Sequence, residues 1–214
     1  MNILGINTSS KGLDLSITNG EDIYFNLSLL GKQRTSKIII NAFKELLELE
    51  DLPVSFIEGI SIITGPGSFT VLKLGMTFAK IFSYIRKIPL IGVDLFEVIF
   101  FHYNYLNEPI EILLPSRKGE FYYMKYLSLE SSGSYKILKN NVLLDTIKKD
   151  HWIYIPYKEL FSIFSKHGYK KLIPGWKFLS KSYTAAILGL EKIKRGEKND
   201  PYTIEPLYIR EFPF

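Results

Sequence analysis

The chain has 214 residues, 46 % of them hydrophobic, and carries 27 lysines and arginines against 22 aspartates and glutamates, a net charge of +5. This length and apolar content suffice for one large domain or two lobes with real cores, and the absence of cysteine excludes disulfide scaffolds, thiolate metal sites, iron–sulfur clusters and cysteine nucleophiles. No apolar run reaches the roughly 18 residues of a membrane span, and the start MNILGINTSS lacks the basic and apolar blocks of a secretory signal, so the sequence predicts a cytoplasmic protein.

Three successive strands are predicted for the first thirty residues, because the apolar residues there alternate with period two. They are ILGIN, GLDLSITNG and EDIYFNLSLL. Asn19-Gly20 separates the second strand from the third and suits the positive φ angles of a tight type I′ hairpin.

The apolar period changes to that of a helix over 33–50, which has an unusually broad apolar arc. GISIITG is then predicted as a buried strand, 68–86 as a second helix, PLIGV as a strand and LFEVIFFHY as the start of a third helix. Three antiparallel strands followed by parallel crossovers are the order of the ribonuclease-H-like half of the actin and sugar-kinase superfamily (ASKHA), by analogy of fold.

After residue 107 the pattern restarts. EILLP, EFYYMKYLS, SYKILK, HWIYIP and KKLIP are predicted strands, whereas LLDTIKK, YKELFSIFSKHG and FLSKSYTAAILGLEKIKRG are predicted helices. We therefore predict an α/β protein of two related lobes, each a mixed sheet with flanking helices, with 1–106 as the first lobe and 107–214 as the second, smaller one. The tail YTIEPLYIREFPF is expected to be extended because its prolines discourage a helix; the tail or the closing helix could pack back on the first lobe.

The three histidines, His102, His151 and His167, form no HxxxH or HExxH pair that would place two imidazoles on one helix face, so we expect no metal site. The basic residues form short clusters, around 166–171 and 192–198, which are more typical of solvated helix faces than of phosphate contacts. The sequence therefore predicts no cofactor and no catalytic site, and it favours at most a weak or indirect contact with nucleic acid.

The stretch TGPGSFTVLKLGMTFAK (64–80) opens like a phosphate-binding loop but lacks the chemistry of one. A P-loop needs GxxxxGK[ST], and no lysine stands at that spacing here; Pro66 also removes one N–H donor. A serine-hydrolase elbow needs GxSxG, and Ser68 lacks the second glycine. We interpret Gly65, Pro66 and Gly67 as a turn, and Ser68 as a helix N-cap whose hydroxyl accepts an N–H of the first turn.

The helix that follows is apolar over most of its circumference. Gly75, Ala79 and Ser83, four residues apart, predict a flat groove into which another helix could pack. Either this helix is sandwiched within its own fold, or it joins the 33–50 helix in a protein–protein interface. The candidate interface residues are Ile39, Phe43, Leu46, Leu47, Phe69, Val71, Leu72, Lys73, Gly75, Met76, Ala79, Phe82 and Ser83.

Five segments spread over the chain together resemble one family. INTSS (6–10) resembles an IDTS start, and TGPGSFTVLKLGMTFAK resembles a GPGSFTGLRIGxxxAK signature. PLIGVDLFEV (89–98) follows that signature, SRKGEFYY (116–123) is similar to DARRGEVY, and EPLYIR (205–210) is similar to a terminal PxYLR. These are the motifs of the bacterial TsaB family, also called YeaZ.

The resemblance implies a two-lobed actin-like fold and a non-catalytic relative of the threonylcarbamoyltransferase TsaD. Members of the TsaB family pair with TsaD and, with the ATPase TsaE, form the machinery that puts threonylcarbamoyl onto the adenosine next to the anticodon of tRNAs. They also form homodimers, and either partner uses the helix pair that corresponds to 33–50 and 68–86 here. The implied partners are thus a TsaD homologue, a TsaE homologue through the complex, and a second copy when TsaD is absent.

The chain departs from the family pattern at several positions. Asn7 replaces an Asp, which removes a carboxylate that would orient metal-bound water, and Val71 and Lys73 replace the Gly and Arg of the signature. Residues 34–36, Arg-Thr-Ser, stand where a His before the Ser is common, and Pro115-Ser116 replaces Asp-Ala. The rival hypotheses are a stand-alone ASKHA-type ATPase, a glycopeptidase-like hydrolase, or direct tRNA binding as the main role.

Overall fold

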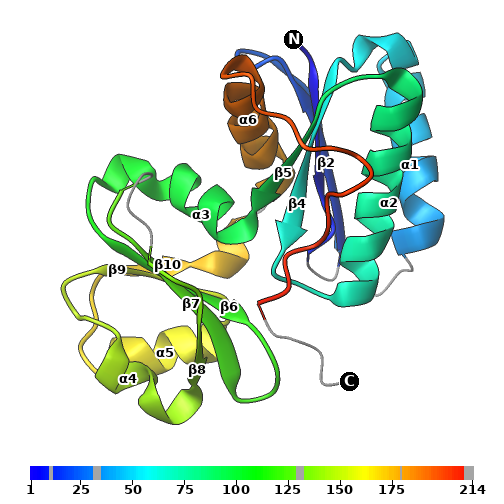
Figure 1. The fold of residues 1–214 in the computed structure, drawn as a ribbon. Helices are drawn as coiled ribbons and strands as arrows, with labels where there is room; N and C mark the ends of the chain where they lie inside the picture. Colours follow the sequence, from blue (N-terminus) through cyan, green and yellow to red (C-terminus); the bar gives the residue numbers. More distant parts are fainter. Residues whose placement is uncertain (10–11, 31–34, 129–132, 179, 210–214) are drawn as a thin grey trace. The chain divides into compact units, whose positions relative to one another are not determined.

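The structure is a computed structural model of the chain, and it describes residues 1–9, 12–30, 35–128, 133–178 and 180–209. The chain divides into two compact units (Figure 1). The first unit comprises Met1–Val98 and Ser180–Tyr208, and the second is built on Ile99–Leu179. In the described ranges, no helix is long and apolar enough to cross a bilayer.

The first unit is a five-stranded mixed sheet with helices on both faces (Figure 1). Its elements are β1 (Ile3–Asn7), β2 (Gly12–Thr18), β3 (Ile23–Leu30), α1 (Thr35–Leu49), η1 (Val54–Phe56), β4 (Gly59–Gly65), α2 (Phe69–Arg86), β5 (Leu90–Asp94) and α6 (Lys181–Lys194), while α3 (Leu95–Tyr103) begins here and ends in the second unit. The strand order is β3-β2-β1-β4-β5. β1, β2 and β3 pair antiparallel, and β4 and β5 continue parallel to β1. The predicted three strands followed by parallel crossovers are thereby confirmed.

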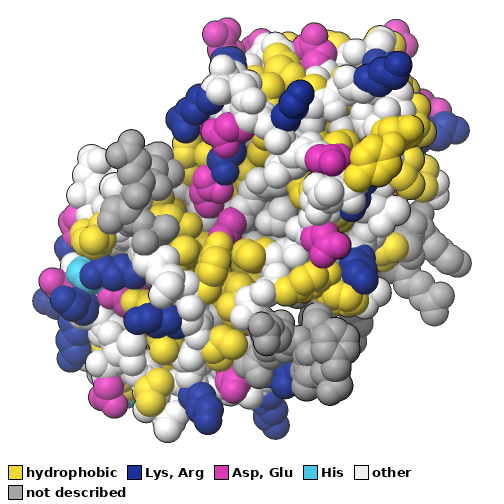
Figure 2. All heavy atoms as spheres, in the orientation of Figure 1, with side chains coloured by type: hydrophobic (Ala, Val, Ile, Leu, Met, Phe, Trp, Pro, Cys, Tyr) yellow, Lys and Arg dark blue, Asp and Glu magenta, His cyan; other side chains and the backbone are white. Residues whose placement is uncertain are grey.

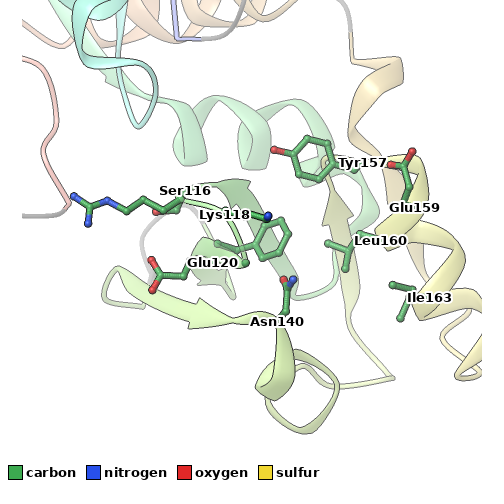
Figure 3. Close-up of a pocket in the computed structure, with 11 residues that line it drawn as sticks. Ser116, Lys118, Glu120, Asn140, Tyr157, Glu159, Leu160 and Ile163 are labelled. Atoms are coloured by element: carbon green, nitrogen blue, oxygen red, sulfur yellow. The ribbon is translucent and has the colours of Figure 1, made fainter.

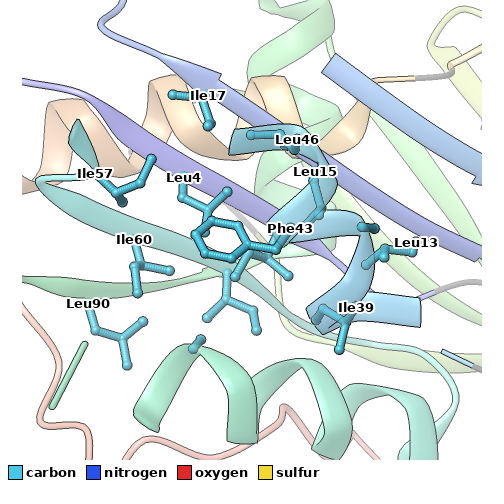
Figure 4. Close-up of a cluster of buried hydrophobic side chains, with 14 of the residues drawn as sticks. Leu4, Leu13, Leu15, Ile17, Ile39, Phe43, Leu46, Ile57, Ile60 and Leu90 are labelled. Carbon is cyan, nitrogen blue, oxygen red and sulfur yellow. The ribbon is translucent and has the colours of Figure 1, made fainter. Parts of the chain in front are cut away.

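The core of the first unit lies between this sheet and the helix pair α1 and α2. Because side chains alternate along a strand, Leu4 and Ile6 of β1 point to the face that α1 and α2 cover, and they join Phe43 and Leu46 of α1 in one buried cluster (Figure 4). Gly5 faces α6, where a Cβ atom would collide with the Ser182 carbonyl.

Helix α6 is an integral part of the first unit, since it packs on β1, β2 and β4. The hydroxyl of Ser61 in β4 donates to the Ala185 carbonyl at 2.6 Å, and a Cβ on Gly189 would collide with Ser61. The expected split after residue 106 therefore needs a correction. The closing helix and the tail as far as Tyr208 belong to the first unit, because small residues let α6 cover the otherwise open face of its sheet.

The second unit repeats the strand plan of the first. Its elements are η2 (Asn104–Leu106), β6 (Ile110–Pro115), β7 (Glu120–Tyr126), β8 (Lys136–Lys139), η3 (Asn140–Val142), α4 (Leu143–Thr146), β9 (Trp152–Ile155), α5 (Lys158–Lys166), β10 (Leu172–Pro174) and η4 (Gly175–Lys177). The strand order is β10-β9-β6-β7-β8, with β6, β7 and β8 antiparallel and β9 and β10 parallel to β6. The chain is thus a two-lobed α/β protein, as the restart of the pattern predicted.

The hairpin between β2 and β3 differs from the predicted type I′ turn. Gly20 has a φ of 101°, but Asn19 is not among the described non-glycine residues with positive φ. Instead, the Asn19 side-chain oxygen accepts the N–H groups of Glu21 and Asp22 at 2.8 and 2.7 Å. A longer loop closed by the Asn19 side chain therefore replaces the tight turn.

Candidate functional site

The signature loop between β4 and α2 packs against the end of the chain's own first strand. A Cβ atom on Gly67 would collide with the carbonyl of Ser9, and the Ser68 N–H points to that carbonyl at 3.4 Å. Gly65 has a φ of 134°, a conformation that favours glycine. The glycine that a phosphate loop uses to approach its ligand here approaches the backbone of the same chain.

Ser68 takes the predicted N-cap position of α2, but its hydroxyl makes no capping hydrogen bond. Its carbonyl accepts the N–H groups of Val71 and Leu72 at 3.1 and 2.9 Å. The predicted hydroxyl cap was therefore wrong, since the exposed Ser68 side chain leaves the first turn to be closed by the backbone.

Asn7, at the end of β1, is held by buried polar groups. Its Nδ2 donates to the Asp14 carboxylate at 2.6 Å, and its Oδ1 accepts the N–H and the hydroxyl of Ser9 at 2.9 and 2.6 Å. Burial raises the pKa of the Asp14 carboxyl above its ordinary value, although the Asn7 hydrogen bond and the charge of Lys181 oppose the rise. Burial lowers the pKa of Lys181 in turn, against the attraction of Asp14. The side chain of Asn7 is thus fully engaged within the protein.

The described residues contain no group of three or more His, Asp or Glu side chains that could hold a metal ion.

Most of the candidate interface residues lie inside the first unit. Phe82 and Val71 are half-buried, whereas Phe69 and Lys73 are exposed, with the Lys73 ammonium 4.3 Å from the centre of the Phe69 ring. The buried members are Ile39, Phe43, Leu46, Leu47, Leu72, Gly75, Met76, Ala79 and Ser83.

The groove formed by Gly75, Ala79 and Ser83 faces the unit's own interior, which corrects the expectation that another helix packs there. A Cβ atom on Gly75 would collide with the side chain of Thr8 at the end of β1. Ala79 is fully buried in the core cluster, and the hydroxyl of Ser83 donates to the Ile88 carbonyl at 2.7 Å. The small residues of α2 therefore allow close approach to β1 and not to a partner.

A different set of apolar side chains is exposed on the outer side of these helices. On α2 the exposed fractions are 55 % for Ile81, 58 % for Tyr84 and 69 % for Ile85, and on α1 they are 61 % for Ile40 and 77 % for Leu49. Hydrophobic side chains gather at the surface over the C-terminal half of α2 in Figure 2. We call Ile40, Leu49, Val54, Ile81, Tyr84 and Ile85 the α1–α2 face.

The α1–α2 face is hollowed at two places. A groove of about 680 Å³ is lined by apolar residues of α1 and the following loop, including Ile40, Leu47 and Val54, and the ion pair of Lys44 and Glu48 stands at its rim. A second hollow of about 420 Å³ lies at the end of α2, between Tyr84, Ile85 and Pro201. A surface with apolar hollows and a charged rim can receive side chains of another protein.

The tail lies against α2 and extends this surface. The ring of Tyr202, which is 71 % exposed, lies 5.3 Å from the ring of Tyr84, and its carbonyl is 3.4 Å from the Lys80 ammonium. Ile204 is buried in the core cluster, and the Leu207 N–H donates to the Thr64 carbonyl at 2.9 Å.

The residues of the α1–α2 face were not among the candidates that the sequence provided, apart from their neighbours on the same helices. Ile81 and Ile85 are one helical turn apart, so the apolar period on α2 contains them. Nothing in that period distinguishes the face that packs on the sheet from the face that remains exposed.

Comparison with known proteins adds a family to this geometry. The family model described as "TsaD: tRNA N6-adenosine threonylcarbamoyltransferase" matches residues 30–157. The chain is 25 % identical over 122 residues to the tRNA threonylcarbamoyladenosine biosynthesis protein TsaB of Bacillus subtilis, a match that spans 57 % of this chain and about half, 53 %, of that protein. It is 25 % identical over 213 residues to the Buchnera aphidicola (strain APS) protein of the same name, with 95 % of this chain and 94 % of that protein covered.

Solved structures share the fold. YeaZ from Pseudomonas aeruginosa superimposes with a TM-score of 0.77 at 14 % identity, covering 97 % of this chain and all of that one. A Bacteroides thetaiotaomicron protein with an actin-like ATPase fold gives a TM-score of 0.52 at 10 % identity, covering 87 % of this chain and 95 % of that one. The two lobes therefore have the actin-like ASKHA fold.

Proposed function

Because the chain belongs to the TsaD family, as one of its TsaB (YeaZ) members, we propose that it is a non-catalytic subunit that binds and activates a TsaD homologue. Family membership supports a role in the biosynthesis of threonylcarbamoyladenosine in tRNA. In this role the chain contributes a surface, and the chemistry belongs to its partner.

The α1–α2 face is the observation that carries this proposal. It exposes six large apolar side chains over two adjacent helices and the loop after α1, and the two hollows between them offer places for anchoring side chains. An apolar patch of this kind on a folded domain marks a site of protein association. Tyr84 and Tyr202 add aromatic contact area of the kind that dominates binding energy at interfaces.

The state of the ATP-site elements supports a non-catalytic role. The amide of Asn7 replaces a carboxylate and is fully hydrogen-bonded to Asp14 and Ser9, while the signature loop closes on the Ser9 backbone. Calorimetric titration of the protein alone with ATP and Mg²⁺ should therefore give no tight binding and no turnover. Tight binding with turnover would favour the rival hypothesis of a stand-alone ATPase.

The same face accounts for the other proposed partners. Without a TsaD homologue, two copies of the chain pair through their α1–α2 faces about a two-fold axis. A TsaE homologue then joins through the complex with TsaD, and the compartment is the cytoplasm.

The variant Ile85→Glu tests the interface. Ile85 is 69 % exposed, so a carboxylate there costs the isolated protein little, whereas burying it in an apolar contact costs several kcal/mol. We expect binding to the TsaD homologue, measured by analytical ultracentrifugation with a labelled partner, to weaken by at least about tenfold, which is about 1.4 kcal/mol.

Ile23→Glu is the matched control, because Ile23 is 52 % exposed in the same unit but lies on β3, away from α2. It should leave binding unchanged, and thermal denaturation should show both variants folded. Equal affinity for wild type and Ile85→Glu would place the partner elsewhere.

A further inference from the structure

The positive charge of the chain is concentrated in the second unit. Residues 99–179 carry 12 lysines and arginines against 7 aspartates and glutamates, an excess of +5, whereas the remaining residues have 15 of each. The unit that carries the α1–α2 face is thus nearly neutral. The second unit has the charge that attracts a polyanion.

A cavity of about 360 Å³ lies in this basic unit, between the β6–β7 hairpin and α5 (Figure 3). One wall consists of the hairpin residues 116–120 and of Asn140, and the facing wall consists of Tyr157, Leu160 and Ile163 at the start of α5. Strand pairing and the Asn140 N–H, which donates to the Gly119 carbonyl at 2.9 Å, hold the hairpin wall in place. The cavity is large enough for one small planar ligand.

The interior offers both an apolar platform and unpaired polar groups. Phe121 and Leu160 are buried at its base, and the Tyr157 ring, which is 44 % exposed, lies 6.2 Å from the Phe121 ring. The Ser116 hydroxyl is buried and, within the described part of the chain, has no hydrogen-bond partner. A buried hydroxyl without a partner costs stability, so this position is one where a ligand or water would be stabilising.

The charged side chains around the cavity favour an anionic group at its mouth. Figure 3 shows the Lys118 ammonium directed into the space below Tyr157, whereas the carboxylates of Glu120 and Glu159 point away from it. Arg117, adjacent to Lys118, is exposed. A ring beside a cation is the arrangement that receives a nucleotide, with the base on the ring and the phosphate on the cation.

We propose that this cavity binds one unpaired nucleotide of an RNA chain. The base stacks on Tyr157, the Asn140 amide and the Ser116 hydroxyl bond to its polar edge, and Lys118 and Arg117 contact its phosphate. The choice of RNA as the source of the nucleotide rests on the proposed function in tRNA modification. The site itself lies in the second unit and shares no residue with the α1–α2 face.

Fluorescence anisotropy with the full-length protein tests this site. The probes are a labelled RNA stem–loop with an unpaired loop and a blunt RNA duplex of the same length. We expect the stem–loop to bind more tightly than the duplex. Tyr157→Leu should weaken stem–loop binding roughly fivefold or more, because a stacked base is lost, while Tyr157→Phe should retain binding.

The cation pair is tested by its salt dependence. Arg117→Gln with Lys118→Gln should reduce the slope of log affinity against log salt by about 1.4, since each phosphate contact on a single strand contributes about 0.7. The matched control is Lys166→Gln with Lys170→Gln, which removes the same charge from exposed positions of the same unit that do not line the cavity. That control should change the slope by less than half as much.

Three results would overturn the proposal: equal losses for the two double variants, equal affinity for stem–loop and duplex, or no effect of Tyr157→Leu. Each would mean either diffuse attraction of RNA to the basic unit or no binding there. The TsaD-binding assay separates this outcome from a failure of the proposed function, because cavity variants should bind TsaD normally and Ile85→Glu should bind the stem–loop normally.

Discussion

Gly67 and Gly75 stand where the chain approaches the end of its own first strand. A Cβ on Gly67 would collide with the Ser9 carbonyl, and one on Gly75 would collide with the Thr8 side chain. Both glycines of the signature stretch are therefore required by packing within the first unit. This requirement explains a glycine inside a helix, where it costs about 1 kcal/mol relative to alanine.

Gly75→Ala should destabilise the protein in spite of the better helix propensity of alanine. The gain of about 1 kcal/mol is opposed by overpacking against Thr8, which typically costs 1–3 kcal/mol, so we expect a net loss of about 1 kcal/mol in the free energy of unfolding by urea. Thr77→Ala, at an exposed position of the same helix, is the control and should be neutral or slightly stabilising. Equal stability of Gly75→Ala and wild type would show that α2 does not lie this close to β1.

Asp14 should make stability depend on pH in a direction opposite to that of most carboxylates. Because burial raises its pKa in the folded state, its contribution is fully present below the unfolded value of about 3.9 and is lost as the pH rises through the folded value. The unfolding free energy of Asp14→Asn minus that of wild type should therefore increase as the pH rises from about 4, and then level off. A difference that decreases over this range would mean that the folded state stabilises the carboxylate.

At the scale of elements, α2 combines the two roles that the sequence left as alternatives. Its inner side, with Leu72, Met76 and Ala79, is buried against the sheet, and its outer side, with Ile81 and Ile85, is exposed. The apolar arc is wide because it covers both sides. Periodicity could predict this width and the helix bounds, but not which side packs on the sheet, since that depends on strand order and on contacts with β1 distant in sequence.

The tail is the element that sequence reasoning placed least well. Its prolines indicated extended structure, but the contacts that hold it come from single hydrogen bonds at the edge of β5. Asn199 donates its N–H to the Leu90 carbonyl, and its Oδ1 accepts the Gly92 N–H, each at 2.8 Å. Such pairs leave no periodic signal in a sequence.

Asn199→Ala should loosen the tail without unfolding the unit. Loss of the bond to Gly92 costs about 1 kcal/mol, so the Leu207 amide, which donates to Thr64, should exchange with solvent roughly fivefold faster. Glu197→Ala, an exposed change just before the tail, should leave this rate unchanged. An unaltered rate in Asn199→Ala would mean that Ile204 alone anchors the tail.

At the scale of the whole molecule, the order of strands and helices was readable from the sequence because each lobe follows the same plan. The boundary between the units was less readable, because the first unit is built from two stretches of chain. Gly5, Ser61 and Gly189 make the contact with α6 possible, but pairing residues so far apart in the chain requires the three-dimensional structure. For the same reason the cavity in the second unit, which joins the β6–β7 hairpin to α5, was not predicted.

A reconstituted tRNA modification assay tests the central claim most directly. Purified TsaD and TsaE homologues would convert tRNA to its threonylcarbamoyladenosine form in the presence of wild-type chain, of Ile85→Glu or of the control Ile23→Glu, or with no chain added. We predict modification with wild type and with Ile23→Glu, and a loss to the level without the chain for Ile85→Glu. Modification that proceeds equally well without the chain, or with Ile85→Glu, would contradict a role as an activating subunit that acts through the α1–α2 face.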